Sequence, residues 1–200
     1  MATPKRIWYE GASYHITARG NHRNDIFRDE SDFNMYLVIM KESLKYYERY
    51  KYELTCYCLM TNHIHLLICA NGKEVEHLIR RVHSIYSRYF NKKYNYVGHL
   101  WQDKYFAELI EDDSQLLQTS RYIHLNPVRA KMVDHAQNYK WSSYSMYLGL
   151  EREELIKSQN ILAYFKNDNC GDLYKQFVES AIKVKSKDVN DKEIVQKEVI

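Results

Sequence analysis

Apolar and polar positions divide the first half of this chain into strands and helices of regular period. Alternating or continuous apolar residues predict strands at 14–18, 53–60, 63–70 and 105–110. Apolar residues at three-and-four spacing predict a helix that Asp32 would cap, and a second helix with an apolar stripe from Val75 to Phe90. The order strand, helix, strand, strand, helix, strand predicts an α+β fold of the ferredoxin-like, split βαβ type. Its antiparallel sheet has two helices on one face.

The other face of the predicted sheet is open, and a third helix is expected to cover it. This helix begins at Asp112 or Asp113, and we expect Pro127 to stop it just past Asn126. Helical spacing places its apolar residues on one side and a polar stripe on the other. That stripe consists of Gln115, Thr119, Tyr122 and Asn126.

Two histidines lie in an otherwise apolar strand, separated by one residue. His63 and His65 project from the same face of an extended chain, so both imidazoles could reach one divalent ion. Thr61 and Asn62 form a tight link to the preceding strand, which predicts an antiparallel hairpin. A His-X-His pair alone also fits two solvent-facing histidines, although the apolar surroundings favour the metal-site interpretation.

A phenol and a carboxamide share one side of the third predicted helix. Tyr122 and Asn126 are four residues apart, which places them on the same helix face. With the histidine pair they suggest a tyrosine nucleophile assisted by a metal ion. Six other histidines show no partner spacing and are interpreted as structural or surface residues: His15, His77, His83, His99, His124 and His135.

Length and composition predict one compact domain with an appendage. The 200 residues are 45% hydrophobic, which is enough for a sizeable core. We place the compact domain at 1–150 and a helical, partly flexible extension at 151–200, with short helices at 155–165 and 173–182. The chain lacks an apolar run of about 18 residues and a signal-peptide pattern at its amino terminus, so we expect a cytoplasmic protein without membrane attachment. The four cysteines have neither disulfide nor zinc-site spacing and are interpreted as reduced thiols.

The basic excess belongs to the first segment. Residues 1–150 hold 20 Lys and Arg against 16 Asp and Glu, a net +4, whereas residues 151–200 hold 9 against 10. The second predicted helix and its end alternate cations with tyrosines: Arg80, Arg81, Arg88, Lys92 and Lys93 with Tyr86, Tyr89, Tyr94 and Tyr96. Such a pattern suits single-stranded nucleic acid, through phosphate pairing and base stacking. An amphipathic helix with a solvated basic face explains it equally well.

Five segments resemble the motifs of a known family, in order and at the right separations. They are 14–21 (YHITARGN), 58–67 (CLMTNHIHLL), 98–105 (GHLWQDKY), 122–130 (YIHLNPVRA) and 141–144 (WSSY). They are similar to the IS200-type single-tyrosine (Y1) transposases, which are HUH endonucleases, and most of all to the REP-associated tyrosine transposases. The resemblance covers about residues 3–149.

This resemblance implies a catalytic site and a substrate. Tyr122 matches the catalytic tyrosine, His63 and His65 match the metal ligands, and Asn126 matches the third ligand, which is a glutamine in the IS200 transposases proper. The implied cofactor is Mg²⁺ or Mn²⁺. The implied partner is single-stranded DNA, often folded as a hairpin. The expected function is metal-dependent cleavage and strand transfer in DNA transposition through a 5′-phosphotyrosine.

Further DNA contacts are expected at two places. The loop with Arg19, Asn21, His22 and Arg23 could hold a short DNA segment, as the resemblance implies, or could be a simple turn closed by Gly20 and Asn21. Trp101, Gln102 and Lys104 follow Gly98, and Trp101 could stack on a base or anchor the core. An alternative function is a domesticated, non-catalytic DNA-binding or regulatory protein derived from a transposase. The sequence leaves open whether the protein is a monomer or a homodimer.

Overall fold

The described part of the chain forms an antiparallel sheet with helices on both of its faces. The computed structural model describes residues 7–165 and 168–185. Its strands are β1 (Ala12–Arg19), β2 (Tyr52–Met60), β3 (His63–Ala70) and β4 (Phe106–Leu109). The strand order is β2-β3-β1-β4, and each neighbouring pair is antiparallel. The predicted ferredoxin-like arrangement is therefore confirmed.

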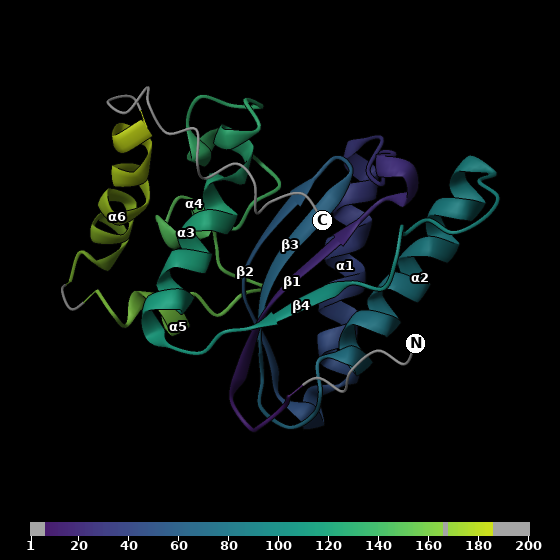
Figure 1. The fold of residues 1–200 in the computed structure, drawn as a ribbon, viewed down its shortest axis with the longest axis horizontal. Coiled ribbons are helices and arrows are strands. Elements are labelled where there is room, and N and C mark those ends of the chain that lie inside the picture. Colours follow the sequence, from purple (N-terminus) through teal and green to yellow (C-terminus); the bar gives the residue numbers. More distant parts are fainter. Residues whose placement is uncertain (1–6, 166–167, 186–200) are drawn as a thin grey trace.

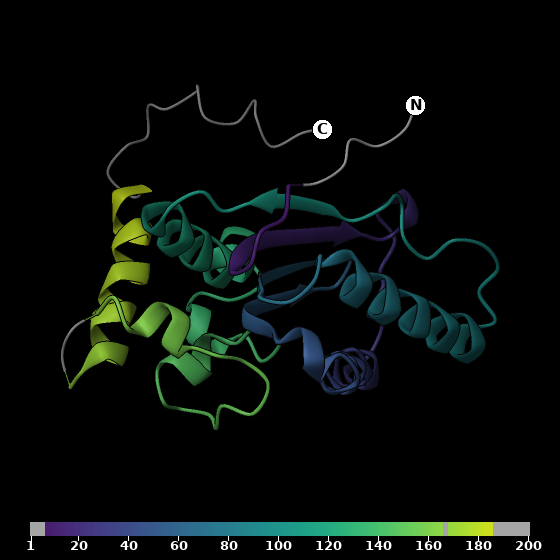
Figure 2. The same cartoon turned by 90° about the horizontal axis from the view of Figure 1, so that it is seen from below.

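The helices divide between the two sides of this sheet. Figure 1 shows α1 (Glu30–Tyr46) and α2 (Glu76–Tyr94) on one side, and α3 (Asp113–Arg129) with α6 (Cys170–Lys185) on the other. The shorter helices are η1 (Asn21–Arg23), η2 (Glu48–Tyr50), η3 (Ala136–Asn138), α4 (Tyr144–Tyr147) and α5 (Gln159–Leu162). Figure 2, turned by 90°, again shows α3 and α6 to one side of the strands and α1 and α2 to the other. Ile64, Leu66 and Ile68 of β3 are fully buried, as their alternation predicts.

The start of α1 corrects the prediction that Asp32 caps this helix. Asp29 is the N-cap, and its carboxylate accepts hydrogen bonds from the backbone N–H groups of Ser31 and Asp32. Asp32 is three residues further on, and its carboxylate accepts from the backbone N–H groups of Arg28 and Asp29. The two aspartates thus form a capping box, and each satisfies donors that the first helical turn leaves unpaired.

The end of α3 corrects the prediction that Pro127 stops this helix. Pro127 lies inside the helix, which continues to Arg129 instead of stopping at Asn126. A proline removes its own N–H donor, but the carbonyls around it remain satisfied: Ala130 N–H donates to Asn126 O at 2.9 Å, and Met132 N–H donates to Pro127 O at 2.9 Å. So close to the helix end, the missing donor costs too little to break the last turn.

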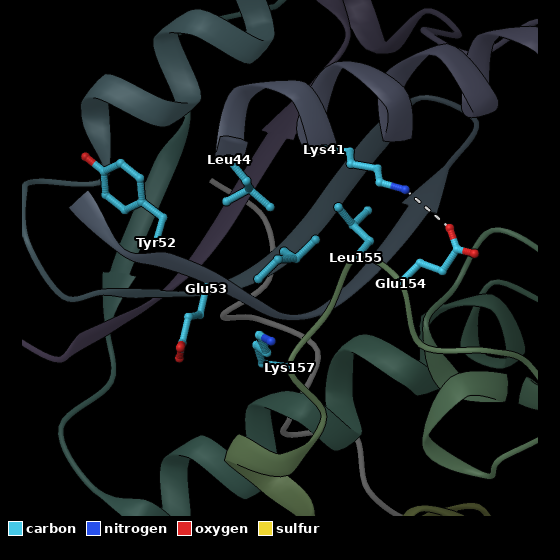
Figure 3. Close-up of a pocket in the computed structure, with 8 residues that line it drawn as sticks. Lys41, Leu44, Tyr52, Glu53, Glu154, Leu155 and Lys157 are labelled. Atoms are coloured by element: carbon cyan, nitrogen blue, oxygen red, sulfur yellow. Dashed lines mark hydrogen bonds and ion pairs between the residues drawn. The ribbon is translucent and has the colours of Figure 1, made fainter. Parts of the chain in front are cut away.

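The chain after α3 covers the outer edge of β2, which no other strand of the sheet pairs with. The carbonyl of Trp141 accepts from Leu59 N–H at 2.9 Å, and Lys157 N–H donates to Leu54 O at 2.8 Å. A shallow pocket of about 240 Å³ remains between β2, α1 and residues 154–157, where Lys41 pairs with Glu154 at 3.3 Å (Figure 3). Covering this edge shields backbone groups that could otherwise pair with another chain.

Helix α6 packs on the side of α3 that faces away from the polar stripe. His124 Nδ1 is 2.7 Å from the Tyr174 hydroxyl, and His124 Nε2 is 2.9 Å from Ser143 Oγ. The Tyr174 hydroxyl also bonds Ser120 at 3.1 Å. These four side chains are fully buried and tie α3 to the later helices. Of the two short helices predicted here, the first is confined to α5 and the second is α6. The predicted flexible end at 183–200 is helical at 183–185, where α6 ends, and its remainder at 186–200 lies outside the described residues.

Within residues 7–165 and 168–185, no helix is long and apolar enough to span a bilayer.

Candidate metal and tyrosine site

The two histidines of β3 lie side by side on the face that α1 and α2 leave uncovered. Their ring centroids are 5.0 Å apart and their planes are nearly perpendicular, at 84°. Within the sheet, His63 lies opposite Met60 and His65 lies opposite Cys58 of β2. His65 is only 6% exposed, whereas His63 is partly buried. The predicted same-face arrangement is present.

Helix α3 brings the tyrosine to this pair and carries the asparagine one turn further along. The rings of Tyr122 and His65 meet edge to face, with centroids 5.5 Å apart. Asn126 is one turn further along α3 and is 9% exposed. Its Nδ2 donates to the carbonyl of Tyr122 at 3.0 Å. Because the carboxamide is planar, its oxygen, the atom that could bind a cation, points to the opposite side of the group.

Burial keeps both imidazoles neutral. Loss of solvation, with a smaller contribution from the positive charge of Arg19, lowers the pKa of His63 to about 4. Burial lowers the pKa of His65 well below its usual value, and the neighbouring His15, His63 and Arg19 act in the same direction. Both rings are therefore uncharged at neutral pH, which is the form that binds metal ions.

The donor set fits a divalent cation held by two imidazoles and one carboxamide. His63 Nδ1 is 2.6 Å from the carbonyl oxygen Oδ1 of Asn62, which can only accept, so Nδ1 carries the proton and Nε2 is the available ligand atom. The Nδ2 of Asn62 donates to Arg23 O at 3.2 Å, which fixes that side chain. In the described residues no cluster of three or more His, Cys, Asp or Glu could hold a metal, and the candidate third donor here is the carboxamide of Asn126. Such a set leaves positions for water and phosphate oxygens.

A third histidine lies at this site, and the interpretation of His15 as a residue without a partner is wrong. His15 Nε2 is 3.1 Å from His65 Nδ1, and its ring is 5.8 Å from that of Tyr122. The alternation of β1 indicates that His15 projects from the face opposite buried Tyr14 and Ile16. This alternation places His15 beside His65 only when β1 is known to pair with β3.

A cation that the sequence reasoning missed lies over the tyrosine. The guanidinium of Arg129 is 4.7 Å from the centroid of the Tyr122 ring. The two residues are seven apart, so they share a helix face, which is the signal that could have found Arg129. On β1, Arg19 lies opposite His63 in the strand pairing, close enough to the histidine pair to lower the pKa of both His63 and His65. Two cations therefore lie near the residues of the candidate site.

Several predicted DNA contacts gather at the end of the sheet where β3 begins. Backbone hydrogen bonds join Gly20 N–H to Asn62 O at 2.8 Å and Gln102 N–H to Arg19 O at 2.9 Å. A Cβ at Gly20 would lie 2.2 Å from Asn24 O, so only glycine allows this close approach. The loop with Asn21 and Arg23 and the segment 101–104 are thereby brought next to His63. Arg19, Arg23, Gln102 and Lys104 are exposed there, and Asn21 is half-buried.

Trp101 is held between this end of the sheet and α2. Its ring stacks on His83 with centroids 4.0 Å apart and planes 16° from parallel. Trp101 Nε1 is buried, and no hydrogen-bond partner for it is found among the described residues. This packing matches the alternative interpretation of Trp101 as a core anchor.

The cations of α2 lie across the sheet from Tyr122. Arg80 pairs with Glu76 at 3.7 Å, and the Arg81 guanidinium stacks 3.8 Å from the Tyr46 ring centroid. The expectation that neighbouring tyrosines present stacking surfaces is wrong for Tyr86, which is fully buried. The half-buried Tyr89 and Tyr94 donate their hydroxyls to Asp32 at 3.0 and 2.7 Å, and Lys93 binds the same carboxylate. The exposed Arg88 completes an amphipathic helix with a solvated basic face.

Comparisons of the sequence and of the fold with known proteins agree with each other. The sequence profile of the family described as "Transposase IS200 like" matches residues 9–126. A protein of Haemophilus influenzae (strain ATCC 51907 / DSM 11121 / KW20 / Rd), assigned by name to the REP-associated tyrosine transposases, is 31% identical over 109 residues. That match covers 48% of this chain and 61% of the relative, so it spans less than two thirds of the relative's length.

A solved structure has the same fold. It is a REP-associated tyrosine transposase bound to a REP hairpin, with a TM-score of 0.60, 14% sequence identity, and coverage of 80% of this chain and 93% of that one. At this identity the likeness concerns the fold alone. The profile match, in contrast, extends over more than half of the chain and includes His63, His65, Tyr122 and Asn126. The chain therefore belongs to the IS200-like transposase family.

Proposed function

We propose that this protein is a metal-dependent endonuclease and strand transferase for single-stranded DNA, with Tyr122 as its nucleophile. One observation carries the proposal: α3 sets the ring of Tyr122 against His65, 5.5 Å between centroids. A phenol from a helix and an imidazole pair from a strand thus meet on the face of the sheet that α1 and α2 leave uncovered.

His63, His65 and Asn126 would hold the cofactor, which we propose to be Mg²⁺ or Mn²⁺. When bound there, such an ion polarises the scissile phosphate and offsets the negative charge that develops during displacement. The two neutral imidazoles favour Mn²⁺, since Mg²⁺ prefers oxygen ligands. The carboxamide oxygen of Asn126 would add one hard ligand.

Tyr122 would attack the phosphorus of a phosphodiester. The new bond joins the phenolic oxygen to phosphorus, the bond to the 3′-oxygen breaks, the phenol loses its proton and the departing oxygen gains one. The products are a 5′-phosphotyrosine and a free 3′-hydroxyl. A phosphodiester-like bond is conserved, so a second 3′-hydroxyl can reverse the step and join a new strand. The Arg129 guanidinium beside the Tyr122 ring can pair with a phosphate oxygen during both steps.

The proposed substrate is a DNA hairpin with single-stranded flanks. The solved structure with the same fold holds a REP hairpin. In this chain the exposed Arg19, Arg23 and Lys104 cluster at the end of the sheet next to His63. A flexible single strand could reach the tyrosine from this end, whereas a stiff duplex would have to unpair first.

A labelled hairpin library tests the function directly. Wild-type protein with Mn²⁺ should form a covalent adduct that maps to Tyr122, and Tyr122→Phe should form none while its DNA affinity stays within about threefold, a difference below roughly 0.7 kcal/mol. Tyr46→Phe is a matched control, because Tyr46 is an exposed tyrosine of α1. An adduct on Tyr122→Phe would assign the nucleophile to another tyrosine. DNA binding without any adduct on the wild-type protein would favour a non-catalytic DNA-binding protein.

A further inference from the structure

We infer that His15 and Glu108 are positioning residues that fix the ring tautomer of His65, so that its Nε2 is free to face the proposed metal position beside Tyr122. The inference rests on the proposed function, since it assigns a role to two residues next to the proposed ligands.

Three strands place these side chains in a row on one face of the sheet. In the pairing of β1 with β3, Thr17 lies opposite His65, so His15, two residues away, is a diagonal neighbour on the same face. In the pairing of β1 with β4, His15 lies directly opposite Glu108. The row Glu108, His15, His65 therefore follows from strand register.

The distances show how the row is connected. His15 Nε2 is 3.1 Å from His65 Nδ1, within hydrogen-bond range, and the two rings are stacked at 20° between their planes. The other ring nitrogen, His15 Nδ1, is 3.8 Å from Glu108 Oε2. This second distance is longer than a direct hydrogen bond, so the carboxylate acts through its charge or through a bridging water.

The negative charge of Glu108 selects one of the two possible proton arrangements. A neutral imidazole carries one N–H and one bare nitrogen. If His15 carried its proton on Nε2, its bare Nδ1 would face the carboxylate, lone pair against negative charge. With the proton on Nδ1, His15 presents an N–H to Glu108 and a bare Nε2 to His65. His65 must then donate from Nδ1, which leaves its Nε2 unprotonated.

The surroundings hold this arrangement in place. His15 is 8% exposed and His65 is 6% exposed, so few water molecules can offer either ring another partner. Glu108 is half-exposed, but Gln115 Nε2 at the start of α3 donates to its Oε1 at 3.5 Å. Gln115 is itself oriented, because its Oε1 accepts from the backbone N–H of Glu111 at 2.7 Å. The helix that carries Tyr122 thus also steadies the carboxylate at the far end of the row.

The tautomer of His65 can be read without any metal. In ¹⁵N-histidine-labelled wild-type protein, long-range ring ¹H–¹⁵N correlations should show the proton of His65 on Nδ1. Glu108→Gln, a change at an exposed side chain that should leave folding intact, should move a measurable fraction of His65 to the Nε2–H form. Glu111→Gln, an exposed carboxylate three residues along, should not. Finding the Nε2–H form in the wild-type protein would overturn the inference.

Calorimetric titration with Mn²⁺ separates positioning from ligation. Residues that orient a metal ligand are worth about 10–100-fold in affinity. We expect a loss of this size for His15→Phe, and a loss of only a few-fold for His15→Gln, whose carboxamide oxygen can replace Nε2 as the acceptor. If His15→Gln abolishes binding as fully as His63→Ala, then His15 is a ligand and the inference is wrong.

The same titration distinguishes this inference from the proposed function. Unchanged Mn²⁺ affinity in His15→Phe together with a large loss in His63→Ala would overturn the positioning role and leave the metal site standing. Unchanged affinity in His63→Ala would reject the metal site itself, and the tautomer measurement on metal-free protein would still decide the role of Glu108 and His15.

Discussion

The ring of Tyr122 meets the ring of His65 edge to face, at 84° between their planes and 5.5 Å between their centroids. One residue comes from a helix and the other from a strand, 57 positions apart in the sequence. This contact sets the phenol beside the imidazole pair before any DNA binds. The proposed nucleophile and the proposed metal ligands are thus preorganised, which lowers the cost of assembling them in the transition state.

The proposed metal ligands should contribute unequally to Mn²⁺ affinity. His63→Ala or His65→Ala removes an imidazole that is neutral at pH 7, and each should weaken Mn²⁺ binding by at least about 100-fold, roughly 2.7 kcal/mol. Asn126→Ala should have a smaller effect, because a water molecule can replace its oxygen ligand. Calorimetry at pH 7 measures these affinities. The exposed His135 provides a control, and a His135→Ala variant that loses as much affinity as His63→Ala would contradict the assignment.

Arg129 should contribute to the rate more than to DNA binding. Its guanidinium lies over the Tyr122 ring at 4.7 Å, where it can offset charge on the attacked phosphate. Arg129→Ala should slow single-turnover cleavage about tenfold, which is roughly 1.4 kcal/mol of transition-state stabilisation. Arg121→Ala is the matched control, since that guanidinium stacks on Phe177 at 4.6 Å on another side of the same helix. Equal rate losses in the two variants would point to general disturbance of α3.

DNA binding should depend on the cations at the end of the sheet and less on those of α2. Arg19→Ala should reduce the slope of log affinity against log salt by about one, as expected when one phosphate contact is lost. Arg80→Ala should change the slope less, because Arg80 is across the sheet and already pairs with Glu76. Fluorescence anisotropy at several salt concentrations measures both. Hairpins with single-stranded flanks should bind more tightly than blunt duplex, and equal affinity for the two would contradict the proposed substrate.

Acid should destabilise the fold through histidines buried away from the site. Burial lowers the pKa of His83 and of His124 to about 3, whereas an exposed histidine titrates near 6.5. The unfolded chain therefore binds these protons first. The stabilising contribution is complete above about pH 6.5 and is lost progressively as pH falls towards 3, at up to about 1.4 kcal/mol per pH unit for each ring.

Urea unfolding at pH 7, 6 and 5 tests this pH dependence. The free energy of unfolding should fall at each step, because charging His83 would bury an Nε2 donor that has no hydrogen-bond partner among the described residues. His77→Gln, a substitution of an exposed histidine, should keep the same slope with pH. A free energy of unfolding that is constant from pH 7 to pH 5 would rule out buried neutral histidines.

The sequence by itself determined the order of the elements and the local chemistry of the site. Period-two and period-three-to-four patterns are local, so they predicted β3, α1, α2 and α3 to within a few residues, and with them the ferredoxin-like fold. The same local geometry put His63 beside His65 and Tyr122 one turn from Asn126. The sequence did not determine the helix ends. Asp29 and Asp32 are both suitable N-cap residues for α1, and Pro127 lies near the end of α3, where the helix tolerates one missing N–H donor.

Only the tertiary structure decided which residues from different elements meet. His15 joins His65 because β1 pairs with β3 in one register, and register depends on long-range packing that no local pattern encodes. The tyrosines next to the α2 cations show the same limit: helical spacing places them beside the arginines, but whether Tyr86 faces DNA or the core depends on α1, which packs against it through Tyr36. Local periodicity therefore fixes the residues that one element displays, whereas long-range packing decides which side chains become buried neighbours.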